Sequence, residues 1–212
     1  MTSHLNTQTT SILGNLIGLT GKKGSGKDTI ANKLKEYGYI QYAFADPLKR
    51  GIQHLFDLSD EQLYGVESKE TIDPRWGVKP RQLFQIIGTE IFQNTIHQHL
   101  KLNVGPKNHW TFLFEEWYRK KIQENPNVKI VVSDIRFPHE LECVKALGGQ
   151  IIKIIRSNNT NNINNINHNI NVDTHSSEIL IDQMDNVDYI IENNGTIDDL
   201  NNNLVKTLNF IK

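Results

Sequence analysis

The chain has 212 residues, a formal net charge of −1, and 37% hydrophobic and 22% charged residues, which suits one globular domain and excludes a general attraction to nucleic acid. No apolar run approaches the roughly 18 residues of a membrane-spanning helix, and the polar first residues lack the pattern of a secretory signal. The single cysteine, Cys143, excludes an internal disulfide, so we expect a protein of the reducing cytoplasm.

Short apolar runs alternate with segments of helical periodicity along most of the chain. Continuous apolar runs predict buried strands, and apolar residues spaced three or four apart predict helices that pack on one face. The expected strands are Leu16–Thr20, Tyr39–Phe44, Lys129–Ser133, Ile151–Ile155 and Asp188–Ile191. The expected helices are Thr29–Tyr37, one opening at Pro47, a long one opening at Pro80, Trp110–Gln123, Pro138–Leu147, and a terminal one marked by Leu200, Leu204, Leu208 and Ile211.

Two of these helices carry explicit expectations about the core. Their inward residues are expected to be Leu48, Ile52, Leu55 and Phe56 in the first, and Leu83, Phe84, Ile87 and Ile91 in the second. Residues 57–78, between them, lack a period and hold several turn formers, so we expect an irregular segment. Strands alternating with helices predict an α/β fold with a mostly parallel, five-stranded sheet covered on both faces.

One segment departs from this alternation. Nine of the sixteen residues in Ser157–Val172 are Asn. Such a tract buries too little apolar area to offset its ordering entropy, so we expect a mobile loop there and a disordered tail at residues 1–13. The abundance of Asn, Ile and Lys, which AT-rich codons encode, weakly suggests a viral source.

A glycine-rich segment directly after the first strand has the spacing of a phosphate-binding loop. Gly21-Lys22-Lys23-Gly24-Ser25-Gly26-Lys27-Asp28-Thr29 carries G-x-x-x-x-G-K between a strand and an amphipathic helix. Glycines let backbone N–H groups point into a concavity, and the helix start adds the positive end of its dipole. The spacing therefore predicts an ATP site in which Lys27 reaches the terminal phosphates. A glycine-rich turn without function is the alternative, and the flanking strand and helix disfavour it.

The ligands of a magnesium ion are less defined. Asp28 follows Lys27, where Ser or Thr is common, so Mg²⁺ would be held by Asp28 or through water. Asp134 closes the strand Lys129–Ser133, as expected of an acidic residue beside a phosphate loop, although a solvated strand-end aspartate would look the same. Arg136, two residues later, can direct a guanidinium at phosphate.

Two further segments concentrate polar groups near strand and helix ends. Asp46 follows the second strand and Lys49 lies one turn later, although Asp46 could serve only as a helix cap. On the helix from Pro80, Arg81, Gln85 and Gly88 share one line, with a solvated helix face as the alternative reading. Both segments could bind a second, anionic substrate.

These segments together resemble the bacteriophage-type deoxynucleoside monophosphate kinase family of P-loop kinases. The resemblance spans about residues 14–180 and is specific, particularly at 134–140. It rests on the loop at 21–29, Phe-Ala-Asp-Pro-Leu-Lys at 44–49, Pro-Arg-Gln-Leu-Phe-Gln-Ile-Ile-Gly-Thr-Glu at 80–90, Asp-Ile-Arg-Phe-Pro-His-Glu at 134–140, Arg156, and Asp-Thr-His-Ser-Ser-Glu at 173–178. Lys79 and Gln93 depart from the family pattern, which commonly has Ser or Thr and Arg at these positions.

The resemblance implies a P-loop kinase three-layer sandwich with helices that bind the monophosphate and a lid at about 156–178. It implies the reaction ATP + dNMP → ADP + dNDP with Mg²⁺, in-line transfer of the γ-phosphoryl group, and a homodimer. By position, Gly24–Thr29 would hold ATP. The acceptor site would contain Lys23, Asp46, Lys49, Arg81, Gln85, Trp110, Asp134, Arg136 and Glu140; Arg156, His175 and Glu178 would flank the lid; Lys27, Asp134, Arg136 and Arg156 would act in catalysis.

Two other functions stay open from the sequence. Phosphomevalonate kinase shares a Gly-Lys-Asp phosphate loop, but does not explain the helix at 81–90. A nucleotide-responsive binding protein that hydrolyses NTP slowly is the second alternative. A guanine-specific switch would have an Asn-Lys-x-Asp motif after a late strand, and the sequence has none.

Overall fold

The computed structural model describes residues 15–105, 109–157 and 180–210. Its centre is a five-stranded sheet in which every neighbouring pair is parallel, in the order β2-β3-β1-β4-β5. The strands are β1 Leu16–Thr20, β2 Tyr39–Tyr42, β3 Lys129–Ile135, β4 Gln150–Ile155 and β5 Tyr189–Glu192. All five strands were predicted from the apolar runs, with ends displaced by two residues at most. The signal is strongest for the central strands β1, β3 and β4, because buried parallel strands read as continuous hydrophobic segments.

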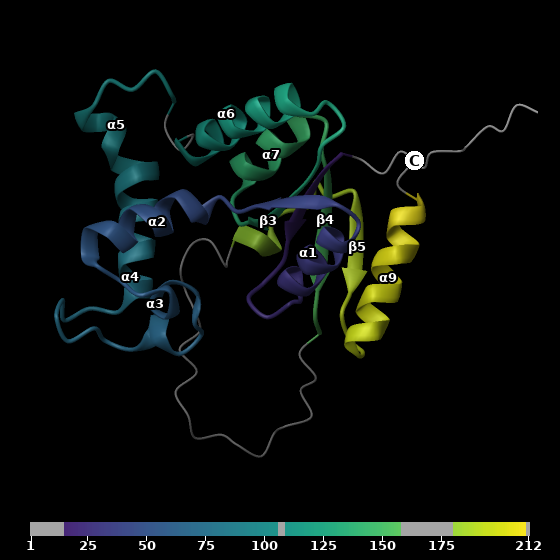
Figure 1. Ribbon diagram of the computed structural model, residues 1–212, viewed down its shortest axis with the longest axis horizontal. Helices are drawn as coiled ribbons and strands as arrows, with labels where there is room; N and C mark the ends of the chain where they lie inside the picture. The colour runs from purple at the N-terminus through teal and green to yellow at the C-terminus, as the bar shows by residue number, and fades with distance from the viewer. Residues whose placement is uncertain (1–14, 106–108, 158–179, 211–212) are drawn as a thin grey trace, which may run out of the picture.

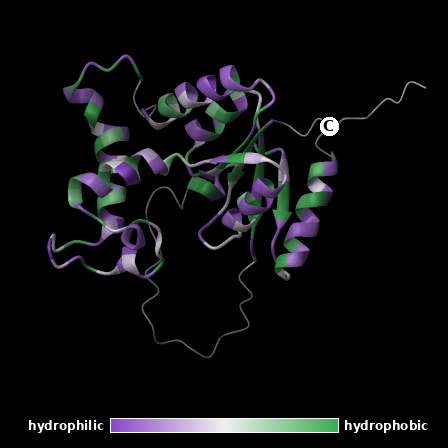
Figure 2. Ribbon diagram, viewed as in Figure 1, coloured by the Kyte–Doolittle hydropathy of each residue, from purple (hydrophilic) through white to green (hydrophobic). Residues whose placement is uncertain are grey.

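Helices cover both faces of this sheet and complete a three-layer α/β fold (Figure 1). One face carries α1 (Lys27–Glu36) and α9 (Ile197–Phe210), and a core cluster joins their apolar residues to Ile17 and Leu19. The other face carries α6 (His109–Glu124) and α7 (Pro138–Ala146), whose Phe114 and Val144 are fully buried. Figure 2 shows the strands mostly in hydrophobic colours between helices that are hydrophilic on their outer sides. The expected architecture is confirmed.

One glycine in β1 allows side chains of the neighbouring strands β3 and β4 to pack closely over it. A Cβ atom on Gly18 would lie 2.4 Å from Cδ1 of Ile135 and 2.7 Å from Cδ1 of Ile151. At these distances the ends of the Ile135 and Ile151 side chains would have to shift to admit a larger residue. Gly18 therefore leaves room for these two side chains to pack over the strand that leads into the phosphate loop.

A helical arm extends from the sheet on the side of β2 (Figure 1). It has its own small core, in which Ile52 and Leu63 are buried and Leu83 packs against them. Its elements are α2 Ala45–Phe56, α3 Asp60–Tyr64, the 3₁₀-helix η1 Ser68–Glu70, α4 Pro80–Gln85, the π-helix η2 Ile86–Thr95 and α5 Ile96–His99.

Residues 57–78 are more ordered than the sequence predicted. Helix α3 begins with a capping box, in which Ser59 Oγ accepts from the Gln62 backbone N–H and the Gln62 side chain accepts from the Ser59 N–H. Asp73 is buried and accepts hydrogen bonds from Gln62 Nε2 and from Arg75. The expectation of an irregular segment is therefore wrong for this part of the arm.

Two of the expected core positions are also wrong. Leu55 of α2 is 72% exposed and Ile91 is 42% exposed. Ile91 lies in the π-helix, whose wider turn changes the face that each residue presents, so the spacing of an α-helix no longer predicts burial. Among the described residues, Leu55 does not join the core cluster of the arm, which forms on the side of α2 that contains Ile52.

Some sequence predictions fall outside the described residues. They are the tail at 1–13, the lid at about 156–178 beyond Ser157, the Asn-rich insertion, and Ile211. Within the ranges that the structure covers, no helix is both long and apolar enough to cross a lipid bilayer.

Candidate active site

The phosphate loop adopts a conformation that only glycine permits easily. Gly21, Gly24 and Gly26 have φ angles of 148°, 77° and 106°. A Cβ on Gly21 would lie 2.4 Å from the Ile154 carbonyl oxygen, and one on Gly26 would lie 2.7 Å from the Asn193 amide nitrogen. The loop is thus held against the ends of β4 and β5, and it leads directly into the N-terminus of α1, where backbone N–H groups are available to an anion.

Two side chains fix the ends of this loop. Asn193 donates a buried hydrogen bond of 2.9 Å from Nδ2 to the Ser25 carbonyl oxygen. The Lys27 ammonium donates to the carbonyl oxygens of Gly21 and of Lys22, the latter at 2.8 Å. Lys27 therefore lies folded over its own loop, where its charge is close to the position that phosphate groups would occupy.

A β-bulge turns the end of β3 toward the arm. Gly18 pairs with Val132, but Thr20 pairs with Ile135, so β3 contains one more residue than β1 at this point. Val132 and Ile135 consequently both enter the same core cluster, although strict alternation would separate them. The residues between them, Ser133 and Asp134, both line a cavity on the arm side of the sheet.

Asp134 joins this strand end to the first turn of α2. Its Oδ1 accepts from the Phe44 N–H at 2.7 Å and its Oδ2 accepts from the Ala45 N–H at 3.0 Å. An anion at a helix N-terminus is favourable because the first N–H groups have no partners inside the helix. Burial raises the pKa of this carboxyl, and the two amide hydrogen bonds and the nearby Arg136 guanidinium oppose the increase.

Glu140 has a comparable role at the start of α7. It is 3% exposed, and its Oε2 accepts from the N–H groups of Arg136 at 2.8 Å and of Phe137 at 3.1 Å. Burial, with the neighbouring Asp134 charge, raises the pKa of Glu140 to about 8. Its carboxyl lies at the cavity wall and holds the backbone that carries the Arg136 side chain.

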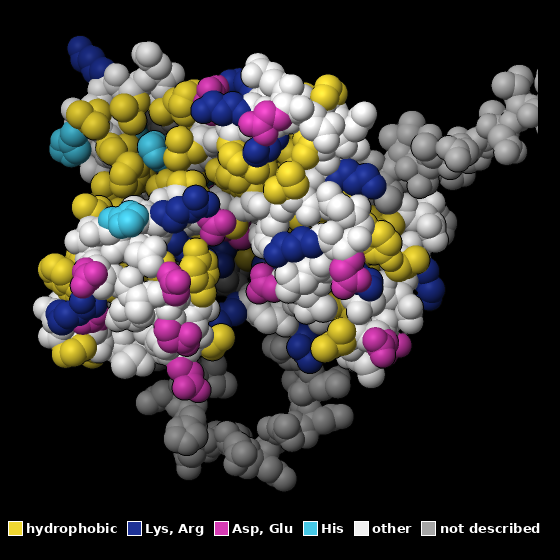
Figure 3. Space-filling model, in the orientation of Figure 1, with side chains coloured by type: hydrophobic (Ala, Val, Ile, Leu, Met, Phe, Trp, Pro, Cys, Tyr) yellow, Lys and Arg dark blue, Asp and Glu magenta, His cyan; other side chains and the backbone are white. Residues whose placement is uncertain are grey.

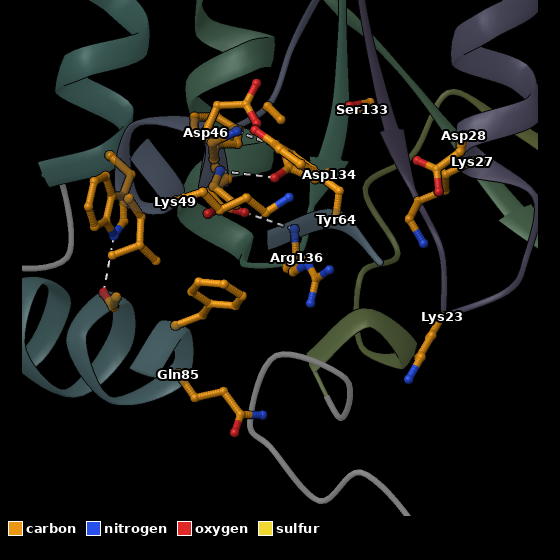
Figure 4. Close-up of a pocket in the computed structure, with 18 of the residues that line it drawn as sticks. Lys23, Lys27, Asp28, Asp46, Lys49, Tyr64, Gln85, Ser133, Asp134 and Arg136 are labelled. Carbon is orange, nitrogen blue, oxygen red and sulfur yellow. Dashed lines mark hydrogen bonds between the residues drawn. The ribbon is translucent and has the colours of Figure 1, made fainter. Parts of the chain in front are cut away.

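The cavity between the sheet and the arm has a volume of about 1070 Å³. This is slightly above the usual range for ligand pockets, about 300–1,000 Å³, and suffices for a mononucleotide. In Figure 4, Lys27 and Asp28 lie on one side of it and Gln85 on the other, with Arg136 between them. Figure 3 shows dark blue Lys and Arg side chains in the hollow where the arm meets the sheet.

Basic side chains dominate the middle of this cavity. Lys23 and Arg81 both form ion pairs with Glu70, the Lys23 ammonium at 3.7 Å from Glu70 Oε1. The Lys49 ammonium lies 4.6 Å from the centre of the Tyr64 ring. Lys69 also lines the cavity, and its role could not be predicted from the sequence because no motif surrounds it.

Apolar and neutral groups line the wall of the cavity that α4, η2 and α6 form. Trp110 is buried, lines the cavity, and donates a hydrogen bond from Nε1 to the Gly88 carbonyl oxygen at 3.1 Å. Phe84 lies at the same wall, and the buried Gln93 contributes an amide where the family pattern commonly has Arg. Aromatic faces with neutral amides are suited to a planar heterocyclic base.

The structure brings most of the predicted site residues to this one cavity. They are Lys23, Gly24, Lys27, Asp28, Asp46, Lys49, Arg81, Gln85, Trp110, Asp134, Arg136 and Glu140. Arg156 lies at the edge of the phosphate loop, with Nη1 donating to the Gly24 carbonyl oxygen at 3.5 Å. Gly21, Lys22, Ser25, Gly26 and Thr29 complete the loop outside the cavity wall, and His175 and Glu178 lie outside the described residues.

The donor set fits a magnesium ion carried largely by phosphate oxygens. Within the described part of the chain, no three His, Cys, Asp or Glu side chains gather closely enough to hold a metal ion by themselves. Mg²⁺ commonly uses one or two carboxylates together with substrate phosphates and water. Asp28 is exposed beside Lys27, and each Asp134 oxygen accepts one amide hydrogen bond and keeps a further lone pair.

Comparisons of the sequence point to one family. Residues 67–204 match the family model described as deoxynucleotide monophosphate kinase. A protein of Acanthamoeba polyphaga mimivirus, assigned by name as a deoxynucleotide monophosphate kinase, is 40% identical over 196 residues, which cover 90% of this chain and 94% of the relative. The deoxynucleoside-5'-monophosphate kinase of Escherichia phage T5 is 23% identical over 61% of this chain and 71% of its own.

More distant similarities agree with the fold. The deoxynucleotide monophosphate kinase of Enterobacteria phage T4 is 26% identical over 65% of this chain, which corresponds to 47% of the phage protein. Among solved structures, the dephospho-CoA kinase from Campylobacter jejuni has a TM-score of 0.50 and 17% identity, covering 93% of this chain and 96% of the other. At this identity the structural likeness shows the fold alone.

Proposed function

The chain belongs to the deoxynucleotide monophosphate kinase family, and we propose from this that it transfers the γ-phosphoryl group of ATP to the phosphate of a deoxynucleoside monophosphate. The observation that carries the proposal is the cavity that joins the phosphate loop to a basic centre and an aromatic end. These three parts match a triphosphate, a monophosphate and a base in that order. Phosphomevalonate kinase activity has no observation in its favour.

Transfer between two polyanions is mainly a problem of charge and position. The acceptor phosphate is already ionised at neutral pH, so the site needs no strong base. It needs cations that hold both substrates in line and that neutralise charge in the transition state. The proposal assigns the ATP phosphates to the loop from Gly21 to Thr29 and to Lys27.

Arg136 is positioned to act on the transferring group. It follows the bulged end of β3, its N–H is held by Glu140, and its side chain lies between the loop and the arm (Figure 4). A guanidinium donates to two oxygens of a phosphoryl group at once. Arg156, beside Gly24 at the opposite edge of the loop, is proposed to add a second guanidinium.

Magnesium belongs to this proposal as a partner of ATP. Asp28 and Asp134 are the side chains that would hold it, and the ion would supply charge neutralisation at the phosphates. Asp134 also holds the first turn of α2. Its position therefore links the phosphate end of the site to the arm that carries Lys49.

Phe84, Gln85 and Trp110 are proposed to hold the base of the acceptor. Phe84 and Trp110 provide aromatic surface at the end of the cavity away from the phosphate loop, and Gln85 can donate and accept hydrogen bonds. Arg81 and Lys49 lie between this end and the loop, where the acceptor phosphate would stand. His175 and Glu178 keep their proposed place at the lid.

An ADP-release assay with each dNMP and NMP, and with mevalonate phosphate as control, tests the function. We expect turnover of ATP that depends on a dNMP and gives the corresponding dNDP. Lys27→Ala should lower turnover by at least about 10³-fold while the circular dichroism spectrum stays that of the parent. Lys120→Ala, on the exposed face of α6, is the matched control and should keep full activity. ATP hydrolysis at a rate that does not change when any of the monophosphates is added would refute the proposal.

A further inference from the structure

Lys69 lies in the cavity among other cations, and no carboxylate of the described residues forms an ion pair with it. Four basic side chains act electrostatically on its ammonium: Lys49, Arg81, Lys23 and Arg136. They come from the phosphate loop, α2, α4 and the segment after β3, whereas Lys69 comes from the short helix η1. Three of the five cations, Lys49, Lys69 and Arg81, therefore belong to the arm, and they meet Lys23 and Arg136 from the main domain in one cavity.

The carboxylate of Glu70, the residue after Lys69, is already paired with two of these basic neighbours. Glu70 forms ion pairs with Lys23 and with Arg81. Across residues 15–105, 109–157 and 180–210, the Lys69 ammonium makes no hydrogen bond or ion pair, although the side chain is partly buried. Burial and the four surrounding cations lower the pKa of Lys69.

Such an arrangement is unfavourable unless an anion joins it. Like charges in a partly desolvated cavity repel one another, and each loses part of its hydration. A phosphate monoester carries about two negative charges at neutral pH and several acceptor oxygens, so it can satisfy several ammonium and guanidinium groups together. The cavity is open and large enough to admit one.

We propose that Lys69 binds the phosphate of the acceptor nucleotide, donating hydrogen bonds from its ammonium to the phosphate oxygens. This inference rests on the proposed function and adds a binding residue to it. The location favours the acceptor over ATP, because Lys69, Lys49 and Arg81 all belong to the arm, whereas the ATP phosphates have the loop amides and Lys27. Lys69 thus supplies a charge that discriminates a monophosphate from an unphosphorylated nucleoside.

The test compares Lys69→Met with Lys69→Arg in the full chain. At saturating ATP, we expect Lys69→Met to raise KM for the best of dAMP, dCMP, dGMP and dTMP by at least about tenfold. KM for ATP should change less than about twofold, and Lys69→Arg should retain most of the acceptor affinity because it keeps the charge. Lys120→Met, an exposed lysine replaced in the same way, is the control for general loss of positive charge.

Calorimetric binding separates phosphate recognition from a distorted pocket. The same dNMP should bind Lys69→Met at least about tenfold more weakly than the parent. The corresponding deoxynucleoside, which lacks the phosphate, should bind both proteins equally. Equal dNMP affinity in parent and Lys69→Met would overturn the role of Lys69 while leaving the kinase function intact, and equal weakening of dNMP and deoxynucleoside would also overturn it. A parent protein that neither binds nor phosphorylates any dNMP would refute both proposals.

Discussion

Individual carboxyl groups in this protein accept hydrogen bonds from backbone N–H groups and so fix the start of a helix. Glu140 is buried, accepts two backbone N–H groups at the start of α7, and has a pKa raised to about 8. In the unfolded chain the same carboxyl titrates near 4.5. Between these values the folded protein keeps a proton that the unfolded chain has lost, so the free energy of unfolding should fall as the pH rises from about 4.5 to about 8.

Glu140→Gln should remove this pH dependence. The amide oxygen can still accept from the Arg136 and Phe137 N–H groups, and it does not titrate. Measured by urea unfolding, the loss of stability between pH 5 and pH 8.5 should be smaller in the variant by at least about 1 kcal/mol, since one pKa unit corresponds to about 1.4 kcal/mol.

Glu142→Gln on the exposed side of the same helix is the control and should follow the parent at every pH. Parallel curves for the parent and Glu140→Gln would show that Glu140 is ionised in the folded protein. In that case its two amide hydrogen bonds would outweigh the cost of burial.

At the residue scale, the sequence could predict the side chains that belong to a motif. Lys27 and Arg136 are identified by the residues around them, and both line the cavity. Lys69 could not be found in this way, because its position depends on how η1 folds back between α3 and α4. The bulge that brings Ser133 and Asp134 to the same cavity also has no signal in an apolar run.

At the scale of elements, the π-helix η2 is the least predictable part of the arm. It spans Ile86–Thr95 and continues α4, so its sequence reads as one long amphipathic helix. The wider turn exposes Ile91 and places Thr89 and Gln93 in buried positions at the cavity. Such π-segments are frequent at functional sites because they shift side chains by part of a turn. The strands, by contrast, were predictable because each contains a short apolar run, which is almost continuously buried in the three central strands β1, β3 and β4.

Trp110 connects this π-helix to the main domain. Its indole N–H donates to the Gly88 carbonyl oxygen, which joins α6 to η2. Trp110→Phe removes that hydrogen bond from a buried site, so the free energy of unfolding should decrease by roughly 1–3 kcal/mol. Because the cavity wall shifts with η2, KM for the dNMP should rise several-fold while KM for ATP stays unchanged. Equilibrium unfolding and initial rates measure the two effects.

The matched control is Trp117→Phe on the same helix. Trp117 packs against Tyr42 and Phe114 but lies outside the cavity wall. Its replacement should lower stability without a selective effect on the acceptor. The same rise in KM for the dNMP in both variants would mean that loss of packing, rather than the bond to Gly88, disturbs the site.

At the scale of the whole molecule, the centre of the sheet depends on distant segments. β1 lies between β3 and β4, and Leu16 pairs with Ile130. β2 pairs only with β3 among the described strands. A fragment of residues 1–128 would therefore contain β1 and β2 without any strand partner, and their apolar residues would remain exposed to water.

We expect this fragment to lack a cooperative fold. In urea it should show no sigmoidal transition, and its near-ultraviolet circular dichroism should be close to zero, in contrast to the full chain. A sharp transition in the fragment would show that the arm, with its small core around Ile52 and Leu63, is stable on its own.

The order of the strands also bears on how the protein is made. A ribosome releases β1 first, and the first strand that can pair with it, β3, begins only at Lys129. During that interval, which lasts several seconds or more at usual synthesis rates, the apolar segment Leu16–Thr20 of the nascent chain has no strand partner. Translation therefore passes through a stage in which aggregation competes with folding, and chaperones that capture hydrophobic stretches should associate with this protein before its phosphate loop has taken shape.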